Sequence, residues 1–302
     1  MTTHDVLVVG EALMDVVESD SAAVEHVGGS PANVALGLGR RGVDVALLTQ
    51  IGPDERGRRI QEHLCASGVK VLQQSTSLER TSTAVAKLAG DGSASYTFDI
   101  AWNALPAVSE VAARVVHTGS IATFLAPGAA TVRRLLDTTQ ADIVTFDPNV
   151  RPALVGERES AVRTFADTAR RAQVVKMSDE DAEWLFPGLT PDDALDAVLG
   201  LGPVLAVVTL GSSGAILALP DARVRTPAPR VVPIDTIGAG DTFMASLIAS
   251  FVSSGLPKTR VDLAELGVQA ARAAAITVSR AGANLPWRNE LEAGLREVAE
   301  QS

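Results

Sequence analysis

The chain has 302 residues, which is enough for one large α/β domain with a small appendage or for two modest domains. Its formal net charge of −10 argues against broad non-specific binding to nucleic acid or to an anionic membrane. The charge does not exclude an anionic ligand, because backbone N–H groups at the start of a helix can hold a phosphate whatever the overall charge.

Cysteine content and hydropathy narrow the class of protein further. The single cysteine, Cys65, excludes an intramolecular disulfide framework. No apolar stretch approaches the ~18–20 residues of a membrane span, and the N-terminus lacks a basic region followed by an apolar run. We therefore expect a cytoplasmic protein. Apolar residues make up 46% of the chain and aromatic residues only 4%, a balance that suits helices packed on a buried sheet.

Short apolar runs and stretches of helical spacing alternate along most of the chain. Taken in chain order, the predicted elements are a strand at 5–10, a helix at 31–40, a strand at 43–48, a helix at 57–67, a strand at 115–118, a helix near 128–139, a strand at 143–147, a helix near 158–172, strands at 174–177 and 205–210, and helices at 239–253 and 263–279. Strands that alternate with helices imply a mainly parallel sheet covered on both faces.

Two segments break this rhythm. Residues 82–104 alternate with period two around the turn sequence GDGS at 90–93, which is a hairpin signal. Residues 12–27 are short, acidic and strand-like. We predict that both belong to a small separate sheet within a single domain over residues 1–302, where it would act as a lid that closes over a ligand and excludes water. An ordinary surface hairpin is the alternative.

The most informative motif is IDTIGAGDTF at residues 234–243, where small residues open a long apolar helix. Gly238, Ala239 and Gly240 let free backbone N–H groups approach an anion closely, and the helix dipole adds attraction for a phosphate. Asp241 follows in the first turn, where it can accept a proton from an attacking hydroxyl. Phosphoryl transfer requires this arrangement of nucleophile, base and electrostatic stabilisation. The alternative is a glycine turn in which Asp241 only caps the helix.

Four further motifs occur in the same order as in a known family. Residues 10–15 (GEALMD), 28–35 (GGSPANVA), 147–152 (DPNVRP) and 209–214 (TLGSSG) stand before the 234–243 motif. Together they resemble the ribokinase-like (PfkB) carbohydrate kinases, and the GE-x-x-x-D opening is nearest to the fructokinases. The resemblance covers nearly the whole chain. It implies a ribokinase-like three-layer α/β/α body with a mainly parallel sheet and a small β-sheet lid.

The resemblance also implies a role for each matched residue. Asp241 would be the catalytic base, assisted by Arg151 near the transferred phosphate and by the backbone of Gly238, Ala239 and Gly240. Sugar hydroxyls would be bound by Asp15, Gly28, Gly29, Asn33, Asn149 and Asp241. The nucleotide would be bound by Lys176, Ser178, Thr209, Gly211, Gly214, Gly238 and Gly240. In the lid hairpin, Phe98 would lie over the sugar, although aromatic residues of small sheets more often serve packing.

ATP and Mg²⁺ are the cofactors that the resemblance implies. The family's N-x-x-E element for hydrated magnesium aligns with residues 178–181, where Ser178 replaces Asn and Asp181 replaces Glu, so Asp181 is expected to reach the ion through water. A potassium site that uses Asp235, the backbone of Ile237 and carbonyls near 279–284 is a further hypothesis. Family members often pair their lids, which makes a homodimer through the lid an expectation.

The predicted function is ATP-dependent phosphorylation of the primary hydroxyl of a small sugar, with D-fructose converted to fructose 6-phosphate. Ribose and 2-keto-3-deoxygluconate remain open as substrates, and so does a sugar or nucleotide sensor without turnover. A nicotinamide dehydrogenase is disfavoured: residues 37–42 match G-x-G-x-x-G, but they end a helix instead of following a strand.

Overall fold

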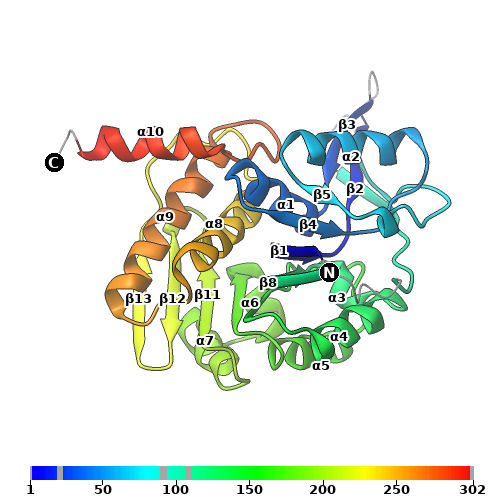
Figure 1. Cartoon of the computed structure of the whole chain (residues 1–302). Helices are drawn as coiled ribbons and strands as arrows, with labels where there is room; N and C mark the ends of the chain where they lie inside the picture. Colours follow the sequence, from blue (N-terminus) through cyan, green and yellow to red (C-terminus); the bar gives the residue numbers. More distant parts are fainter. Residues whose placement is uncertain (1, 19–22, 89–93, 106–110, 300–302) are drawn as a thin grey trace.

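The computed structural model describes residues 2–18, 23–88, 94–105 and 111–299. Two separate sheets organise the chain (Figure 1). The larger sheet has nine strands in the order β13-β12-β11-β10-β9-β8-β1-β4-β5, and the smaller has four in the order β3-β2-β6-β7. The predicted combination of a large, mainly parallel sheet with a small second sheet is confirmed.

The large sheet contains all six strands that the sequence predicts for the α/β body. Its strands are β1 (Thr2–Val9), β4 (Val45–Leu48), β5 (Lys70–Val71), β8 (Val111–Gly119), β9 (Ile143–Asp147), β10 (Val174–Ser178), β11 (Leu205–Thr209), β12 (Ala215–Leu219) and β13 (Ala222–Thr226). Neighbouring strands run parallel from β5 to β11, and only β12 and β13 are antiparallel to their neighbours. We had not predicted β5, β12 or β13.

Helices cover both faces of this sheet. They are α1 (Ser30–Arg40), α2 (Glu55–Ala66), α3 (Ile121–Phe124), α4 (Gly128–Thr138), α5 (Arg158–Ala169), α6 (Asp179–Leu185), α7 (Pro191–Leu199), α8 (Ala239–Ser254), α9 (Arg260–Val278) and α10 (Arg288–Ala299). In the described ranges, no helix combines the length and the apolar character needed to cross a bilayer.

Alternation along β1 divides the core into two layers. Val6 and Val8 pack in a cluster that includes α1, α8 and α9, whereas Leu7 and Val9 pack in a second cluster with α4, α5 and α7. Figure 1 shows these two groups of helices on opposite sides of the sheet. Successive side chains of a strand point to opposite faces, so a buried parallel strand must be apolar on both. The result is the expected three-layer body.

The parallel strands bring the chemically interesting motifs to one edge of the sheet. The 10–15 motif follows β1, the 147–152 motif begins at the last residue of β9, and Thr209 ends β11. Ligands of open α/β sheets bind outside the carboxyl ends of the strands. The topology therefore gathers segments that are distant in sequence at the edge where a ligand is expected.

The small sheet is built from β2 (Leu13–Glu18), β3 (Ala23–Gly28), β6 (Thr83–Leu88) and β7 (Ala94–Asp99). The pairs β2–β3 and β6–β7 are antiparallel, whereas β2 and β6 are parallel. Asp15 lies opposite Ala84, which in turn lies opposite Phe98, so Asp15 and Phe98 share a face of the sheet. The predicted turn at 90–93 lies outside the described residues.

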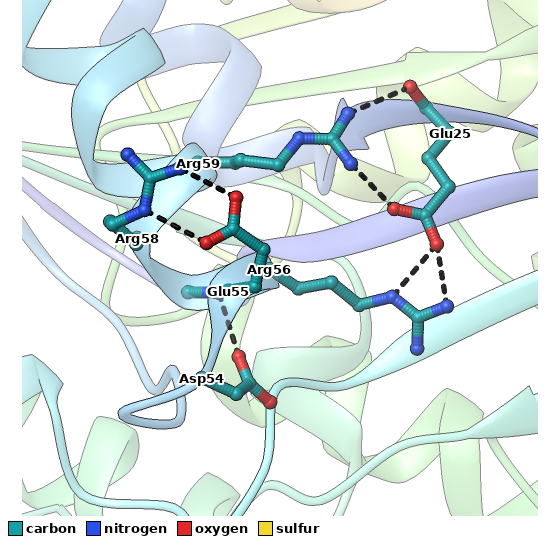
Figure 2. A network of polar contacts seen from close by, with 7 residues as sticks. Glu25, Asp54, Glu55, Arg56, Arg58 and Arg59 are labelled. Carbon is teal, nitrogen blue, oxygen red and sulfur yellow. Dashed lines mark hydrogen bonds and ion pairs between the residues drawn. The ribbon is translucent and has the colours of Figure 1, made fainter.

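Helix α2 holds the small sheet against the body (Figure 2). The carboxylate of Glu25 on β3 accepts hydrogen bonds from Arg56 Nη2 at 2.5 Å and Arg59 Nη1 at 2.6 Å. Asp54, which caps α2 by accepting from the N–H of Gly57 at 2.8 Å, also accepts from the N–H of Thr81 at 2.7 Å, just before β6. Both halves of the small sheet are thus tied to the first turns of one helix.

We expect Glu25→Gln to lower the free energy of unfolding by about 1 kcal/mol, because the variant loses two partly exposed ion pairs that salt screens. Urea unfolding at low and high salt checks this, and the difference from wild type should shrink at high salt. Glu55→Gln is the matched control, because Glu55 forms an ion pair with Arg58 on the exposed surface of the same helix and not with the small sheet. A salt-independent loss in the Glu25 variant would contradict the ion-pair explanation.

Candidate active site

The predicted phosphate-binding turn is the start of α8. Gly238 precedes the helix with φ of 78°, a left-handed conformation that favours glycine, and a Cβ there would lie 2.9 Å from the Cβ of Ala283. Asp241 lies in the first turn and is only 9% exposed. The turn therefore has the small residues and the dipole direction that an anion site needs, with a buried carboxylate beside it.

Both oxygens of Asp241 accept hydrogen bonds from α1. Ser30 Oγ donates to Oδ1 at 2.6 Å, and Asn33 Nδ2 donates to Oδ2 at 2.8 Å. The two helices approach closely because α1 has Gly37 at the contact, where a Cβ would lie 2.9 Å from the Cβ of Ala245. Burial raises the pKa of Asp241, and the bonds from Ser30 and Asn33 oppose that rise. A buried carboxylate with a raised pKa is suited to accept a proton.

Three predicted sugar-site residues lie together beside the small sheet. Burial raises the pKa of Asp15 to about 6, against the opposing effect of Arg151. A Cβ on Gly28 would lie 1.9 Å from Asp15 Oδ2, and Gly29, with φ of 100°, is pressed against the carbonyl of Glu11. The Asp241 charge also raises the pKa of Asp15, so the two carboxylates are near enough to interact. The structure thus brings Asp15, Gly28 and Gly29 near the Asn33–Asp241 pair.

The other residues predicted to bind the sugar or to assist catalysis are Phe98, Asn149 and Arg151. Phe98 is partly exposed on the Asp15 face of the small sheet. Asn149 has φ of 34°, in the left-handed region that asparagine tolerates better than most residues. Arg151 is exposed, yet its charge lowers the pKa of both Asp15 and Asp241. Its guanidinium therefore lies near enough to both carboxylates to favour their charged forms.

Lys176 forms a buried ion pair with Asp147 at 2.7 Å. Lys176 is 4% exposed and Asp147 1%. A Cβ on Gly240 would lie 3.0 Å from Lys176 Nζ, so the ammonium group lies directly at the start of α8. Burial alone would lower the pKa of Lys176, but Asp147, Asp181 and Asp241 raise it above its ordinary value. The lysine is thus charged where the anion site is expected.

Asp147 is a functional candidate that the sequence analysis quoted only as part of a motif. Burial raises its pKa to about 6 despite the neighbouring Lys176. Its Oδ1 is buried and has no hydrogen-bond partner among the residues that the structure describes. A charged, buried oxygen without a partner is costly, so this atom is available to a ligand or to water. The DPN sequence directly after an apolar strand was the signal that could have identified it.

Ser178 and Asp181 form a reciprocal cap at the start of α6. The N–H of Asp181 donates to Ser178 Oγ at 3.0 Å, and the N–H of Ser178 donates to Asp181 Oδ2 at 2.9 Å. Asp181 Oδ1 accepts from the N–H of Val150 at 2.7 Å, which ties the 147–152 motif to α6. The carboxylate predicted to reach magnesium through water therefore also has a structural role.

The nucleotide-loop residues lie at the same edge. Thr209 pairs with Ser178 across β11 and β10. Gly211 and Gly214 have φ of 52° and 93°, and the N–H of Leu210 donates to the carbonyl of Gly214 at 2.7 Å, which closes a tight turn. A Cβ on Gly214 would lie 1.9 Å from the carbonyl oxygen of Thr226, so only glycine fits. The loop thus has a fixed shape and directly follows the carboxyl end of β11.

The predicted potassium site brings together two segments. Asp235 Oδ1 accepts from the N–H of Ile237 at 3.0 Å, and Oδ2 accepts from the N–H of Gly282 at 2.9 Å. Within the described part of the chain, no group of three or more His, Cys, Asp or Glu side chains converges as metal ligands. A cation there would depend on backbone carbonyls, as the sequence hypothesis states.

Sequence reasoning gave no role to two residues that touch this site, Ser30 and Glu11. Ser30 stands inside the GGSPAN motif but carries no signal of its own. Glu11 is buried, its side chain accepts from the N–H of Ala122 at 3.2 Å, and burial raises its pKa to about 7. A glutamate at the end of an apolar strand was the available signal for Glu11.

Two surface hollows lie elsewhere. One of about 700 Å³ lies at α6 and α7, and its lining includes Trp184 and Leu189. The other, of about 340 Å³, adjoins the start of α2 and includes Asp54. Neither is lined by any of the predicted catalytic, sugar or nucleotide residues. The candidate site is defined by the convergence of Asp15, Asn33 and Asp241.

Comparison with known proteins agrees with this arrangement. Residues 3–290 match the model of the pfkB family carbohydrate kinases. A fructokinase from Rhizobium leguminosarum bv. trifolii is 34% identical over 88% of this chain and 85% of its own. A fructokinase structure from Vibrio cholerae O395, in a fructose-, ADP- and calcium-bound form, superposes with a TM-score of 0.82 at 27% identity over 97% of this chain and 98% of that one. A ribokinase structure from Thermotoga maritima shares the fold, with a TM-score of 0.77 at 22% identity over 97% and 99% of the two chains. The chain belongs to the pfkB family of carbohydrate kinases.

Proposed function

We propose that the chain is an ATP-dependent fructose kinase that converts D-fructose to fructose 6-phosphate. The observation that carries the proposal is the buried carboxylate of Asp241 at the start of α8, bound by Ser30 and Asn33 and near Asp15. A base, a polar sugar platform and a helix start for the phosphate thus meet at one place. The fructokinase relatives support fructose as the acceptor.

In the proposed reaction, Asp241 takes the proton of the primary hydroxyl as its oxygen attacks the γ-phosphorus. The bond from the γ-phosphorus to the bridging oxygen breaks, and ADP leaves. The N–H groups of Gly238 and Gly240 and the charged Lys176 stabilise the negative charge on the transferred group. The N–H of Ala239, predicted to share this role, instead donates to the carbonyl of Thr236 at 3.2 Å. Arg151 supplies a second positive charge on the sugar side.

Magnesium is part of this proposal, and the acidic side chains near the start of α8 fit it. Asp147 offers an unpartnered buried oxygen, and Asp181 lies close enough to raise the pKa of Asp147. Magnesium usually keeps several waters and is held by one or two carboxylates with substrate phosphates. When bound, the ion would neutralise charge on the nucleotide phosphates. We also propose a potassium site near Asp235, because the side chain of Asp235 holds the backbone of Ile237 and Gly282 close together.

The small sheet is the proposed lid over the sugar, because Asp15 and Phe98 share the face that adjoins the site. One domain that carries this lid remains our description of the whole chain. The homodimer through the lid also stays a prediction. Val24 on the edge strand β3 is 50% exposed, which is compatible with a contact there.

Phosphorylation of fructose, ribose and 2-keto-3-deoxygluconate, measured side by side with ATP consumption, tests the function. We expect kcat/KM for fructose to exceed the other two. A preference for ribose or 2-keto-3-deoxygluconate would overturn the substrate while keeping the reaction. Thermal stabilisation by sugar and ATP without any phosphate transfer would instead support the non-catalytic sensor.

A further inference from the structure

Ser30 occupies a fixed position at the first residue of α1. It is 8% exposed, and the backbone on each side of it is held in place. On the N-terminal side, Gly29 lies against the carbonyl of Glu11. On the C-terminal side, the ring of Pro31 packs on Gly10 so closely that a Cβ added to Gly10 would lie 2.3 Å from Pro31 Cγ. The hydroxyl of Ser30 is therefore presented to α8 by a rigid segment.

Asp241 receives one donor on each oxygen, and the two donors differ in chemistry. The amide nitrogen of Asn33 can only donate, whereas the hydroxyl of Ser30 can donate or accept. Each carboxylate oxygen has two lone-pair sites, so one site on each stays open after these bonds form. An incoming hydroxyl can thus deliver its proton without displacing Ser30 or Asn33.

Several charged groups face Asp241 from other elements. Lys176 on β10 and Arg151 after β9 favour its ionised form. Asp15 on β2 and Asp147 on β9 interact with it as like charges. The hydrogen bond from Ser30 is the largest of the influences that favour the ionised form, ahead of Asn33, Lys176 and Arg151. A charge-assisted bond of 2.6 Å in a buried site is strong.

We propose that Ser30 is a positioning residue of the phosphoryl transfer: its hydroxyl keeps Asp241 ionised and oriented as the base. The inference rests on the proposed function, in which Asp241 accepts the proton. Ser30 itself touches neither the sugar nor the phosphate in this assignment. It differs in this respect from Asn33, which the family resemblance assigns to the sugar.

The test is the pH profile of kcat/KM for fructose, whose acidic limb reports the base of the free enzyme. For an acidic base, activity is lost as pH falls through its pKa. In Ser30→Ala we expect the limb to move to higher pH by about one to two units, because the ionised form of Asp241 loses a hydrogen bond to its charge. At pH values well above the acidic limb, the activity of Ser30→Ala should be within a few-fold of wild type. Ser30→Thr keeps the hydroxyl and should restore the limb.

Ser250→Ala is the matched control, since Ser250 lies on the same helix as Asp241 but donates only to the carbonyl of Ser246 in the preceding turn and to Gln269. Its profile should equal that of wild type. An unmoved limb with a raised KM for fructose in Ser30→Ala would make Ser30 a sugar ligand and overturn the proposal. If Ser30→Ala instead loses the same fraction of activity at every pH and has a lower Tm, Ser30 has only a structural role, and the proposal is likewise overturned.

The variant Asp241→Asn separates this inference from the function on which it rests. If that variant is inactive and the limb of Ser30→Ala does not move, only the role of Ser30 is wrong. If Asp241→Asn retains turnover, Asp241 is not the base, and both statements fall together.

Discussion

Replacement of Asp241 by Asn is expected to lower kcat for fructose by about 10³-fold or more, which is the scale of a general-base contribution. The amide has nearly the same shape and can still accept from Ser30 through its oxygen, so the packing of α1 on α8 should survive. It cannot take a proton from the attacking hydroxyl. Steady-state kinetics give kcat, and calorimetric titration with fructose should give a nearly unchanged Kd.

Asp221→Asn is the control for this experiment. Asp221 is an exposed aspartate in the turn between β12 and β13 and should leave kcat unchanged. Near-normal turnover in the Asp241 variant would rule out the assigned base. A loss of fructose binding equal to the loss of kcat would indicate that Asp241 holds the sugar and leaves deprotonation to another group.

The second large effect concerns the buried ion pair of Lys176 and Asp147. We expect Asp147→Asn to lower the free energy of unfolding by about 3 kcal/mol, because it leaves a buried ammonium without its hydrogen-bonded partner. The double variant Asp147→Asn with Lys176→Met should recover most of this loss. Urea unfolding of the two single variants and the double variant measures the coupling energy directly.

The pH dependence of Lys176→Met gives an independent check. Without the lysine, burial raises the pKa of Asp147 even further above the ordinary value of about 4. A carboxyl whose pKa is raised in the folded state favours folding at low pH and loses that contribution as pH rises through the folded pKa. The variant should therefore lose stability relative to wild type as the pH rises above about 4, the ordinary pKa of an aspartate.

The exposed pair of Arg171 and Asp137 is the control for this cycle. Its nitrogen–oxygen distance is 2.6 Å, similar to the buried pair, but Asp137 is half exposed. Asp137→Asn should cost less than about 1 kcal/mol. If the Asp137 and Asp147 variants lose equal free energy of unfolding, burial does not strengthen the dependence of the fold on the Lys176 pair. The stable double variant is also expected to be a poor kinase, because the charge beside Gly240 is gone.

The elements of the body followed closely from the sequence because each has a strong local pattern. The run before Gly10 is apolar on both faces, as a central parallel strand must be, and β1 spans Thr2–Val9. The strand β12 (Ala215–Leu219) was not predicted, although it is entirely buried. Its five apolar residues stand between turn residues, which is the ordinary signal of a short buried strand, so the sequence did carry the information.

The sequence predicted which residues belong to the site better than it predicted the contacts between them. Spacing within 234–243 placed Asp241 in the first turn of a helix, because glycines and the apolar run that follows define that start. The hydrogen bond from Ser30 to Asp241 joins residues 211 positions apart, and no local pattern encodes it. The same is true of the bond from the N–H of Val150 to Asp181, which ties the 147–152 motif to α6.

The sequence by itself determined the alternation of strands and helices, the glycine-lined helix start and the identity of the proposed base. These depend on backbone propensity and on neighbours within about one turn. Only the tertiary structure decided which donors hold Asp241, which carboxylate pairs with Lys176, and how Glu25 ties the small sheet to α2. Such contacts depend on how closely two helices pack and on which strand ends share an edge, and these are properties of the whole folded chain.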